Sequence, residues 1–232
     1  MSVIIREVKS RVELKAFISF PEKLYKNSPY WVNALWSDEY KTLLKSENPA
    51  FEYCEAWYFI AERDGKVIGR VAAIINHNAN RDWQTKNMRF GWLDFIDDID
   101  VSGALLGKVE ELAYEKGMTA VNGTFGFTDM DREGMLTEGF ENMGAFTTLY
   151  NYSYYPDHLE KLGFIKDAEW VQREFDVPED VPEKLKQYSR IVKQKYRVSI
   201  LEVKSKKELR SYAIDLFNAL NKAFVPLYGF TP

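Results

Sequence analysis

The chain has 232 residues, of which 46% are hydrophobic and 15% aromatic, so it can form a sizeable core and is too apolar for a disordered protein. Its net charge of −4 excludes the overall basic field that nucleic-acid-binding proteins use. A single cysteine, Cys54, excludes an internal disulfide and a cysteine-rich metal site. The sequence shows neither a signal peptide nor an apolar run of membrane-spanning length, so we expect a cytoplasmic protein with no membrane and no nucleic-acid partner.

The first quarter of the chain predicts one strand and two helices. Val3 to Val8 is strand-like. Ser10 and Glu13 have the spacing of a capping box, in which the serine hydroxyl and the glutamate side chain satisfy each other's backbone amides. This pattern predicts a helix over residues 11–25, and a second helix is expected over residues 36–45.

The next segment predicts a β-hairpin. Two β-rich runs, residues 56–63 and 66–75, flank Asp64-Gly65, and an Asp-Gly pair in this position is a strong hairpin signal. The polar stretch from Asn76 to Asp82 is expected to be a loop. Another strand is expected over Met88–Ile96.

A strand that leads directly into a helix is expected at Met88–Ile96. The unpaired amides at a helix N-terminus bind anions, and this arrangement is a common way to build a site for an anionic cofactor. The connecting turn carries Asp97, Asp98 and Asp100, whose charges favour the helix dipole and oppose a bound phosphate. The helix is expected to end near Gly117, and a short strand should follow at residues 119–122.

The remainder of the first domain predicts a long ordered loop and two further elements. Residues 122–144 contain five glycines and are expected to form a functional loop. A short helix is expected over residues 156–162 and a strand over residues 168–177.

A partial internal repeat suggests a second domain. Glu7-Val-Lys-Ser10 matches Glu202-Val-Lys-Ser205, and each is followed by a Glu-Leu pair at the same spacing. We therefore expect a first domain over residues 1–177, a linker helix within 178–196, and the start of an incomplete second copy over 197–232. The basic residues of the linker helix are interpreted as a solvated face.

Two motifs resemble the GNAT acyltransferase superfamily. Ser102–Gly117 resembles the helix after the family's pyrophosphate loop, and Leu159-Glu-Lys-Leu-Gly-Phe164 resembles the end of its penultimate helix. The resemblance covers residues 3–177. It implies an α/β (α+β) fold with a mixed, mostly antiparallel central sheet flanked by helices. In the family, the sheet splays open between the strands that correspond to Met88–Ile96 and Thr119–Asn122, and acyl-CoA lies in that gap.

The resemblance also implies which residues form the site. Acetyl-CoA or another acyl-CoA would be held by these residues: Leu93, Asp94, Phe95, Ser102, Gly103, Ala104 and Lys108. The tyrosine that usually acts as the acid corresponds to Leu159, so Tyr154 and Tyr155 are the candidates to replace it, and Asp94 is the candidate base. The amine substrate would be oriented by Asn122, Thr124 and Asn151.

Three functional hypotheses remain open. The first is an N-acyltransferase that transfers an acyl group, expected to be acetyl, from acyl-CoA or an acyl-carrier protein to a small-molecule amine by direct attack. The second is a non-catalytic GNAT-like domain that serves as a scaffold or binding module for a catalytic second copy. The third is a partner-binding module that exposes the tyrosine-rich segment Tyr150–Tyr155. His77 and His158 lack metal-ligand spacing, so no metal site is expected.

Overall fold

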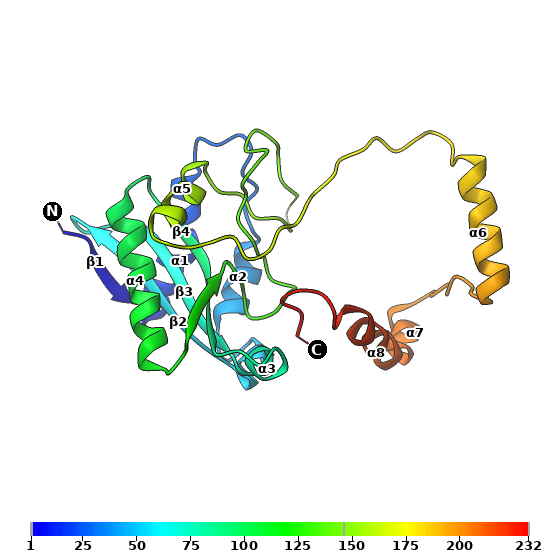
Figure 1. Ribbon diagram of the computed structural model, residues 1–232, viewed down its shortest axis with the longest axis horizontal. Helices are drawn as coiled ribbons and strands as arrows, with labels where there is room; N and C mark the ends of the chain where they lie inside the picture. The colour runs from blue at the N-terminus through cyan, green and yellow to red at the C-terminus, as the bar shows by residue number, and fades with distance from the viewer. Residues whose placement is uncertain (1, 146, 232) are drawn as a thin grey trace. The chain divides into compact units, whose positions relative to one another are not determined.

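A computed structural model describes residues 2–145 and 147–231 of the chain. The chain forms two compact units. The first runs to Asp167 and includes the segment from Leu227 onward, and the second is Ala168–Pro226. The first unit contains the five-stranded sheet shown in Figure 1, whose strands lie in chain order: β1 (Ile4–Glu7), β2 (Cys54–Arg63), β3 (Lys66–Asn76), β4 (Asn87–Phe95) and β5 (Ala120–Gly123).

The sheet is antiparallel from β1 to β4, and β5 runs parallel to β4. β4 and β5 pair only from Asn87↔Ala120 to Phe90↔Gly123. β5 is paired along its whole length, and β4 continues to Phe95 beyond it, so the last residues of β4 have no partner strand on this side; we call this place the opening. The expected mixed, mostly antiparallel sheet is confirmed, and the expected gap for acyl-CoA stays a prediction.

The helices of this unit cover both faces of the sheet. Their bounds are α1 (Arg11–Leu24), α2 (Trp36–Leu43), the 3₁₀ turn η1 (Pro49–Glu52), α3 (His77–Asp82), α4 (Ile99–Glu115) and α5 (Tyr154–Lys161). Successive residues of β3 contribute to opposite faces, as the pleat of a strand requires. Val71 and Ala73 pack with α4 and α5 in one core, and Ala72 and Ile74 pack with α1 and α2 in the other.

Local signals account for the first elements. The Glu13 amide donates to Ser10 Oγ at 3.2 Å and the Ser10 amide donates to Glu13 Oε2 at 2.9 Å, so the expected capping box starts α1. Asp64 and Gly65 both have positive φ, at 54° and 70°, which suits a tight hairpin turn between β2 and β3.

Two expected elements differ from the structure. The polar segment Asn76–Asp82 is not a loop, because Asn76 Oδ1 accepts the Ala79 amide at 2.8 Å and caps the short helix α3. Residues 168–177 form no strand, and Phe175 is exposed. The strand expected there is wrong, because a strand needs a neighbour to pair with and none of the five strands of the sheet pairs with this segment.

The second unit contains α6 (Glu183–Tyr196), α7 (Lys206–Ser211) and α8 (Ala213–Phe224). The repeat seen in the sequence is also present in its hydrogen bonds. The Glu208 amide donates to Ser205 Oγ at 3.2 Å, and the Lys204 amide donates to Glu208 Oε2 at 2.9 Å, as the Lys9 amide donates to Glu13 Oε2 at 2.9 Å. The segment before Ser205 is not a strand, and the second GNAT-like copy stays a prediction.

Close backbone approach next to the opening requires glycine at position 91. A Cβ at Gly91 would collide with the Phe125 carbonyl oxygen, which is backbone and cannot rotate away. We expect Gly91→Ala to lower the free energy of unfolding by about 3 kcal/mol. Gly107→Ala is the control, because open space surrounds that helical position and the gain in helix propensity should stabilise the protein by about 1 kcal/mol. Urea denaturation measures both; equal effects would contradict the close approach.

Candidate functional site

The end of β4 that extends beyond β5 still pairs with β3, and it begins with a β-bulge. Arg70 pairs with Asp94 and Ala72 pairs with Gly91, so Trp92 and Leu93 together stand opposite Val71. Trp92 has a φ of 45°, which is rare for a bulky residue. A bulge of this kind redirects the backbone groups and side chains of its strand. Here it turns the strand at the opening.

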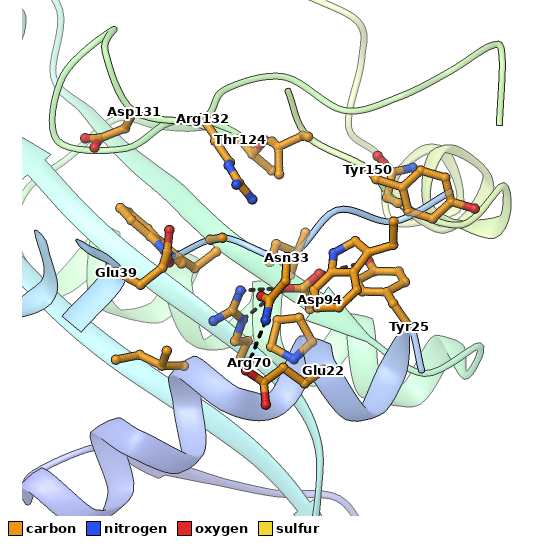
Figure 2. A pocket seen from close by; sticks show the side chains of 18 of the residues that line it. Glu22, Tyr25, Asn33, Glu39, Arg70, Asp94, Thr124, Asp131, Arg132 and Tyr150 are labelled. Atoms are coloured by element: carbon orange, nitrogen blue, oxygen red, sulfur yellow. Dashed lines mark hydrogen bonds and ion pairs between the residues drawn. The ribbon is translucent and has the colours of Figure 1, made fainter. Parts of the chain in front are cut away.

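A pocket reaches this end of β4 from the side of α1 and α2. It holds about 970 Å³ of space not filled by atoms, its open mouth included. Figure 2 shows Arg70 and Asp94 in its floor and Thr124 on the opposite wall. Its aromatic lining residues are Tyr25, Trp31, Trp36, Trp92, Tyr150 and Tyr155, and its acidic ones are Glu22, Glu39, Asp94 and Asp131.

The floor is a buried ion pair. Arg70 donates from Nε at 2.8 Å and from Nη2 at 2.7 Å to Asp94 Oδ2, and both side chains are largely buried. Arg70 also donates from Nη1 to the Phe17 carbonyl at 2.9 Å and lies over the Phe17 ring. Asp94 Oδ1 accepts the Tyr25 hydroxyl at 2.9 Å. The candidate base Asp94 is therefore bonded at both carboxylate oxygens, which suits a group that holds its neighbours in place.

Two phenols of α5 lie at this end of β4. The Phe95 amide donates to Tyr155 Oη at 3.1 Å, and Tyr154 donates to the Phe95 carbonyl at 2.6 Å. Tyr155 Oη is also 2.8 Å from Tyr25 Oη. Since Tyr25 donates to Asp94, Tyr155 donates to Tyr25, and the hydroxyls form a chain that ends at the carboxylate. The amide of Phe95, a residue expected to hold acyl-CoA, is thus already bonded to Tyr155.

The tyrosines of this network stay protonated at neutral pH. Burial, followed by the nearby Asp94 charge, raises the pKa of both Tyr25 and Tyr155 well above the usual value. Burial also raises the pKa of Tyr154. Each is therefore a neutral hydrogen-bond donor, which is the form that a general acid must have. Tyr150, Tyr152 and Tyr154 are partly buried and Tyr155 is buried, so the tyrosine-rich segment is not an exposed patch.

α4 begins at Ile99, three residues before Ser102, where the resemblance places the start of the helix. Asp98 caps it by accepting the Asp100 amide at 3.0 Å, and Arg63 donates to the other Asp98 oxygen at 2.8 Å. The bond from Arg63 lowers the pKa of Asp98. The Ser102 amide donates to the Asp98 carbonyl at 3.3 Å, so Ser102 lies inside the helix and Gly103 and Ala104 follow it there.

A Ser-His-Asp cluster joins α4 to α5. Ser102 Oγ is 2.9 Å from His158 Nδ1, and His158 Nε2 is 3.1 Å from Asp97 Oδ1. Ser102 Oγ also donates to the Ile99 carbonyl at 3.1 Å, so the serine is bonded to the first turn of α4 as well as to the histidine of α5. Ser102 is completely buried, so the cluster holds the two helices together and is not open to a substrate. No local pattern indicates this cluster, because His158 lies more than fifty positions from both Ser102 and Asp97.

The other candidate residues lie in separate places. Lys108 pairs with Glu111 at 2.7 Å and lies near the Phe59 ring, away from the N-terminus of α4. Thr124 lines the pocket and donates to the Gly134 carbonyl. Asn151 also lines the pocket, and its side chain bonds to the backbone of Leu136 and Tyr152.

Asn122 lies in β5 and bonds to Tyr228, and it is not among the residues that line the pocket. Of the three residues expected to orient the substrate, the structure therefore brings only Thr124 and Asn151 together. The roles assigned to all of these residues remain predictions.

The glycine-rich loop holds a group of half-buried carboxylates beside Arg89. Burial raises the pKa of Glu133 to about 7 and also raises the pKa values of Asp129 and Asp131. Glu133 Oε2 is buried with no hydrogen-bond partner. Arg89 is itself buried, and it donates to the Gly229 carbonyl at 3.4 Å.

The raised pKa of Glu133 predicts that the free energy of unfolding depends on pH. The unfolded chain releases the Glu133 proton near pH 4.5 and the folded chain near pH 7, so stability is greatest below this window and falls as the pH rises through it. We expect the free energy of unfolding to be about 1 kcal/mol lower at pH 8 than at pH 5.5, because partial exposure weakens the effect. Glu133→Gln should reduce this slope, and the exposed control Glu138→Gln should not. Urea titrations at both pH values measure it; parallel slopes would contradict the assignment.

Across residues 2–145 and 147–231, no group of three or more histidine, cysteine, aspartate or glutamate side chains is arranged to hold a metal ion. Within the same residues, every helix is too short or too polar to cross a bilayer.

Comparisons with known proteins give relatives that are longer than this chain. No protein-family model matches it. Over 176 residues it is 30% identical to Protein YghO of Escherichia coli (strain K12), which covers 73% of this chain and 44% of that protein. Over 177 residues it is 27% identical to the bacterial ceramide synthase of Caulobacter vibrioides (strain NA1000 / CB15N), covering 76% of this chain and 46% of the relative. The chain spans less than half the length of these curated relatives.

The solved structures that resemble this chain include a tandem GNAT protein from the clavulanic acid biosynthesis pathway. It has a TM-score of 0.45 and 13% sequence identity, and the match covers 70% of this chain and 43% of that one. The chain's own strand order and its single parallel pair, between β4 and β5, are those expected from the GNAT resemblance. The chain therefore has a GNAT-like fold.

Proposed function

We propose that this chain carries the acyl-transfer domain of a GNAT-type N-acyltransferase, which transfers an acyl group from acyl-CoA to an amine. The observation that carries the proposal is the pocket that ends at Leu93 and Asp94, on the bulged part of β4 that extends beyond β5. A thioester lying in the opening and an amine lying in the pocket would meet at this strand. Bringing two reactants together in this way supplies a large part of the rate enhancement of such reactions.

The reaction would be a direct attack. The bound ammonium ion first loses a proton to water at the pocket mouth. The free amine nitrogen then adds to the thioester carbonyl, the carbon–sulfur bond breaks, the nitrogen releases a second proton to water, and the thiolate takes a proton. An amide of β4 would stabilise the negative oxygen that develops, and Leu93 is the candidate because the Phe95 amide is bonded to Tyr155. Tyr155 would protonate the thiolate and regain its proton through Tyr25. Asp94 and Arg70 would hold this pair of phenols in position.

The lining of the pocket supports a cationic acceptor with an apolar body. Glu22 and Glu39 accept hydrogen bonds from the neutral groups Asn33 Nδ2 and Trp92 Nε1. The four lining carboxylates outnumber the two lining arginines, Arg70 and Arg132, and together with the aromatic faces they favour an ammonium ion. One relative is named a ceramide synthase, and a ceramide is an N-acylated long-chain amino alcohol. We therefore include long-chain amino alcohols among the candidate acceptors.

A specific observation favours the alternative of a non-catalytic GNAT-like domain. Tyr155 and Tyr154 bond to both backbone groups of Phe95, and Asp98 with Arg63 occupies the N-terminus of α4. Three aspartates next to this terminus would repel a pyrophosphate. If these features have abolished cofactor binding, Asp97→Gly with Asp100→Gly should create or strengthen affinity for CoA.

The deciding experiment combines binding and turnover. Calorimetry with acetyl-CoA and with a long-chain acyl-CoA measures cofactor binding, and release of free CoA thiol in the presence of alkylamines and long-chain amino alcohols measures transfer. The amide product is identified by mass spectrometry, and alcohols of equal chain length without the amine are the control. Binding with amine-dependent thiol release supports the transferase. No heat for either donor at high micromolar concentration would favour the scaffold.

A further inference from the structure

The linker helix α6 is both basic and amphipathic. Over Glu183–Tyr196 it carries five basic residues and one acidic residue, although the whole chain has a net charge of −4. At 100° per residue, Leu185, Tyr188, Val192 and Tyr196 fall within an arc of roughly 80°. Lys186, Arg190 and Lys193 lie on the opposite side of the helix. We call these two sets the apolar face and the basic face of α6.

Within the second unit, the apolar face of α6 is uncovered. Its side chains are 46–63% exposed, and none of the residues of this helix is buried. An isolated helix of this length is only marginally stable in water, and exposed apolar side chains are unfavourable there. A helix with this composition needs a surface that removes its apolar face from water.

We propose that α6 binds the surface of an anionic lipid bilayer, lying in the interface with its apolar face toward the acyl chains. Anionic headgroups would attract the basic residues, and the acyl chains would take up Leu185 and Val192. Tyr188 and Tyr196 suit this position, because a tyrosine ring is apolar and its hydroxyl stays in contact with water. Lys184 and Lys195 lie over these two rings and can extend their ammonium groups to the headgroups.

Charge and the apolar face argue against two other occupants. A second copy of α6 would bring two strongly basic helices together across a symmetric interface, which is unfavourable. A nucleic acid would neutralise the charge but leave the apolar face in water. The expectation that the chain has no membrane partner rested on the missing transmembrane span, and a helix that lies in the interface needs no such span. The inference is independent of the acyl-transfer proposal.

The test is co-sedimentation of the whole chain with vesicles of phosphatidylcholine alone and of equal parts phosphatidylcholine and phosphatidylglycerol. We expect binding to the anionic vesicles only, weakened by salt and accompanied by a gain of helical circular dichroism. Lys186→Gln, Arg190→Gln and Lys193→Gln together should weaken binding by about fivefold per charge, or roughly a hundredfold. The control Lys15→Gln, Lys23→Gln and Lys26→Gln makes the same change in net charge on exposed residues of the first unit and should have little effect.

The apolar face is tested separately. Leu185→Gln with Val192→Gln should abolish binding, and Leu216→Gln with Phe217→Gln in α8, where the replaced side chains are also exposed but lack a basic face, should not. Sedimentation with neither vesicle would overturn the proposal, as would an equal loss of binding in the two triple variants. A concentration-dependent dimer that Leu185→Gln dissociates would also overturn it, because a second copy would then cover this face.

Discussion

Replacing Asp94 by alanine is expected to lower the free energy of unfolding by about 3–5 kcal/mol. The change leaves the Arg70 guanidinium buried without its carboxylate partner, while its hydrogen bond to the Phe17 carbonyl remains. It also removes the acceptor of the Tyr25 hydroxyl. An unpaired buried charge costs far more than the loss of the contact itself, so the effect should exceed that of most core truncations.

Two further variants separate the unpaired charge from the loss of packing. Asp94→Leu combined with Arg70→Met removes both charges and should recover most of the stability, because an apolar pair of similar volume needs no compensation. Glu111→Ala breaks the exposed pair with Lys108 and should cost less than about 1 kcal/mol. Urea or thermal denaturation measures all three. If the double variant is as unstable as Asp94→Ala, the charge of Arg70 is not the cause.

Local chemistry explains why much of the fold could be predicted. The hairpin follows from Asp64-Gly65, and the start of α1 follows from Ser10 and Glu13, since each signal acts within a few residues. The helix α4 follows from an apolar stripe that ends at a glycine. The prediction of a loop from Asn76 to Asp82 was wrong because a local signal was overlooked. The Asn76 side chain caps a helix of six residues there.

The site was less predictable because its bonds join distant positions. Tyr154, Tyr155 and Asp94 were identified from the sequence, and the structure brings them together around Phe95. Tyr25 and Arg70, which complete the network, carry no local signal. The same limit explains why Ser102 was expected to bind a phosphate, although its hydroxyl contacts His158 on α5.

The basic run of α6 shows a different limit. Its charges are visible in the sequence, and a solvated face is the simplest interpretation of them. The sequence cannot show whether the opposite, apolar face is covered, because that depends on contacts made elsewhere in the chain. Leu185 and Val192 are exposed, so the helix has an apolar face as well as a basic one, and both faces together indicate a lipid surface as its partner.

Tyr155→Phe is expected to lower kcat for acyl transfer about a hundredfold and to leave the affinity for acyl-CoA nearly unchanged, if the chain is the proposed transferase. The buried hydroxyl is neutral at physiological pH and bonded to Tyr25, so it can release a proton to a thiolate and recover one from its neighbour. The phenylalanine keeps the ring stacked on Phe95 and removes only the hydroxyl. The Phe95 amide then lacks its partner, at a cost of about 1–3 kcal/mol in stability.

Tyr154→Phe is the matched control, because this neighbour bonds to the carbonyl of the same residue and has no phenol relay. It should change kcat by less than about tenfold. Changing the leaving group of the acyl donor distinguishes a role of Tyr155 as the acid from a merely structural role. An acyl donor with an arylthiol departs as a stable thiolate without a proton, so the Tyr155→Phe variant should regain most of its rate with that donor. Equal losses with both donors, or equal losses in both variants, would show that Tyr155 supports the strand end and does not act as the acid.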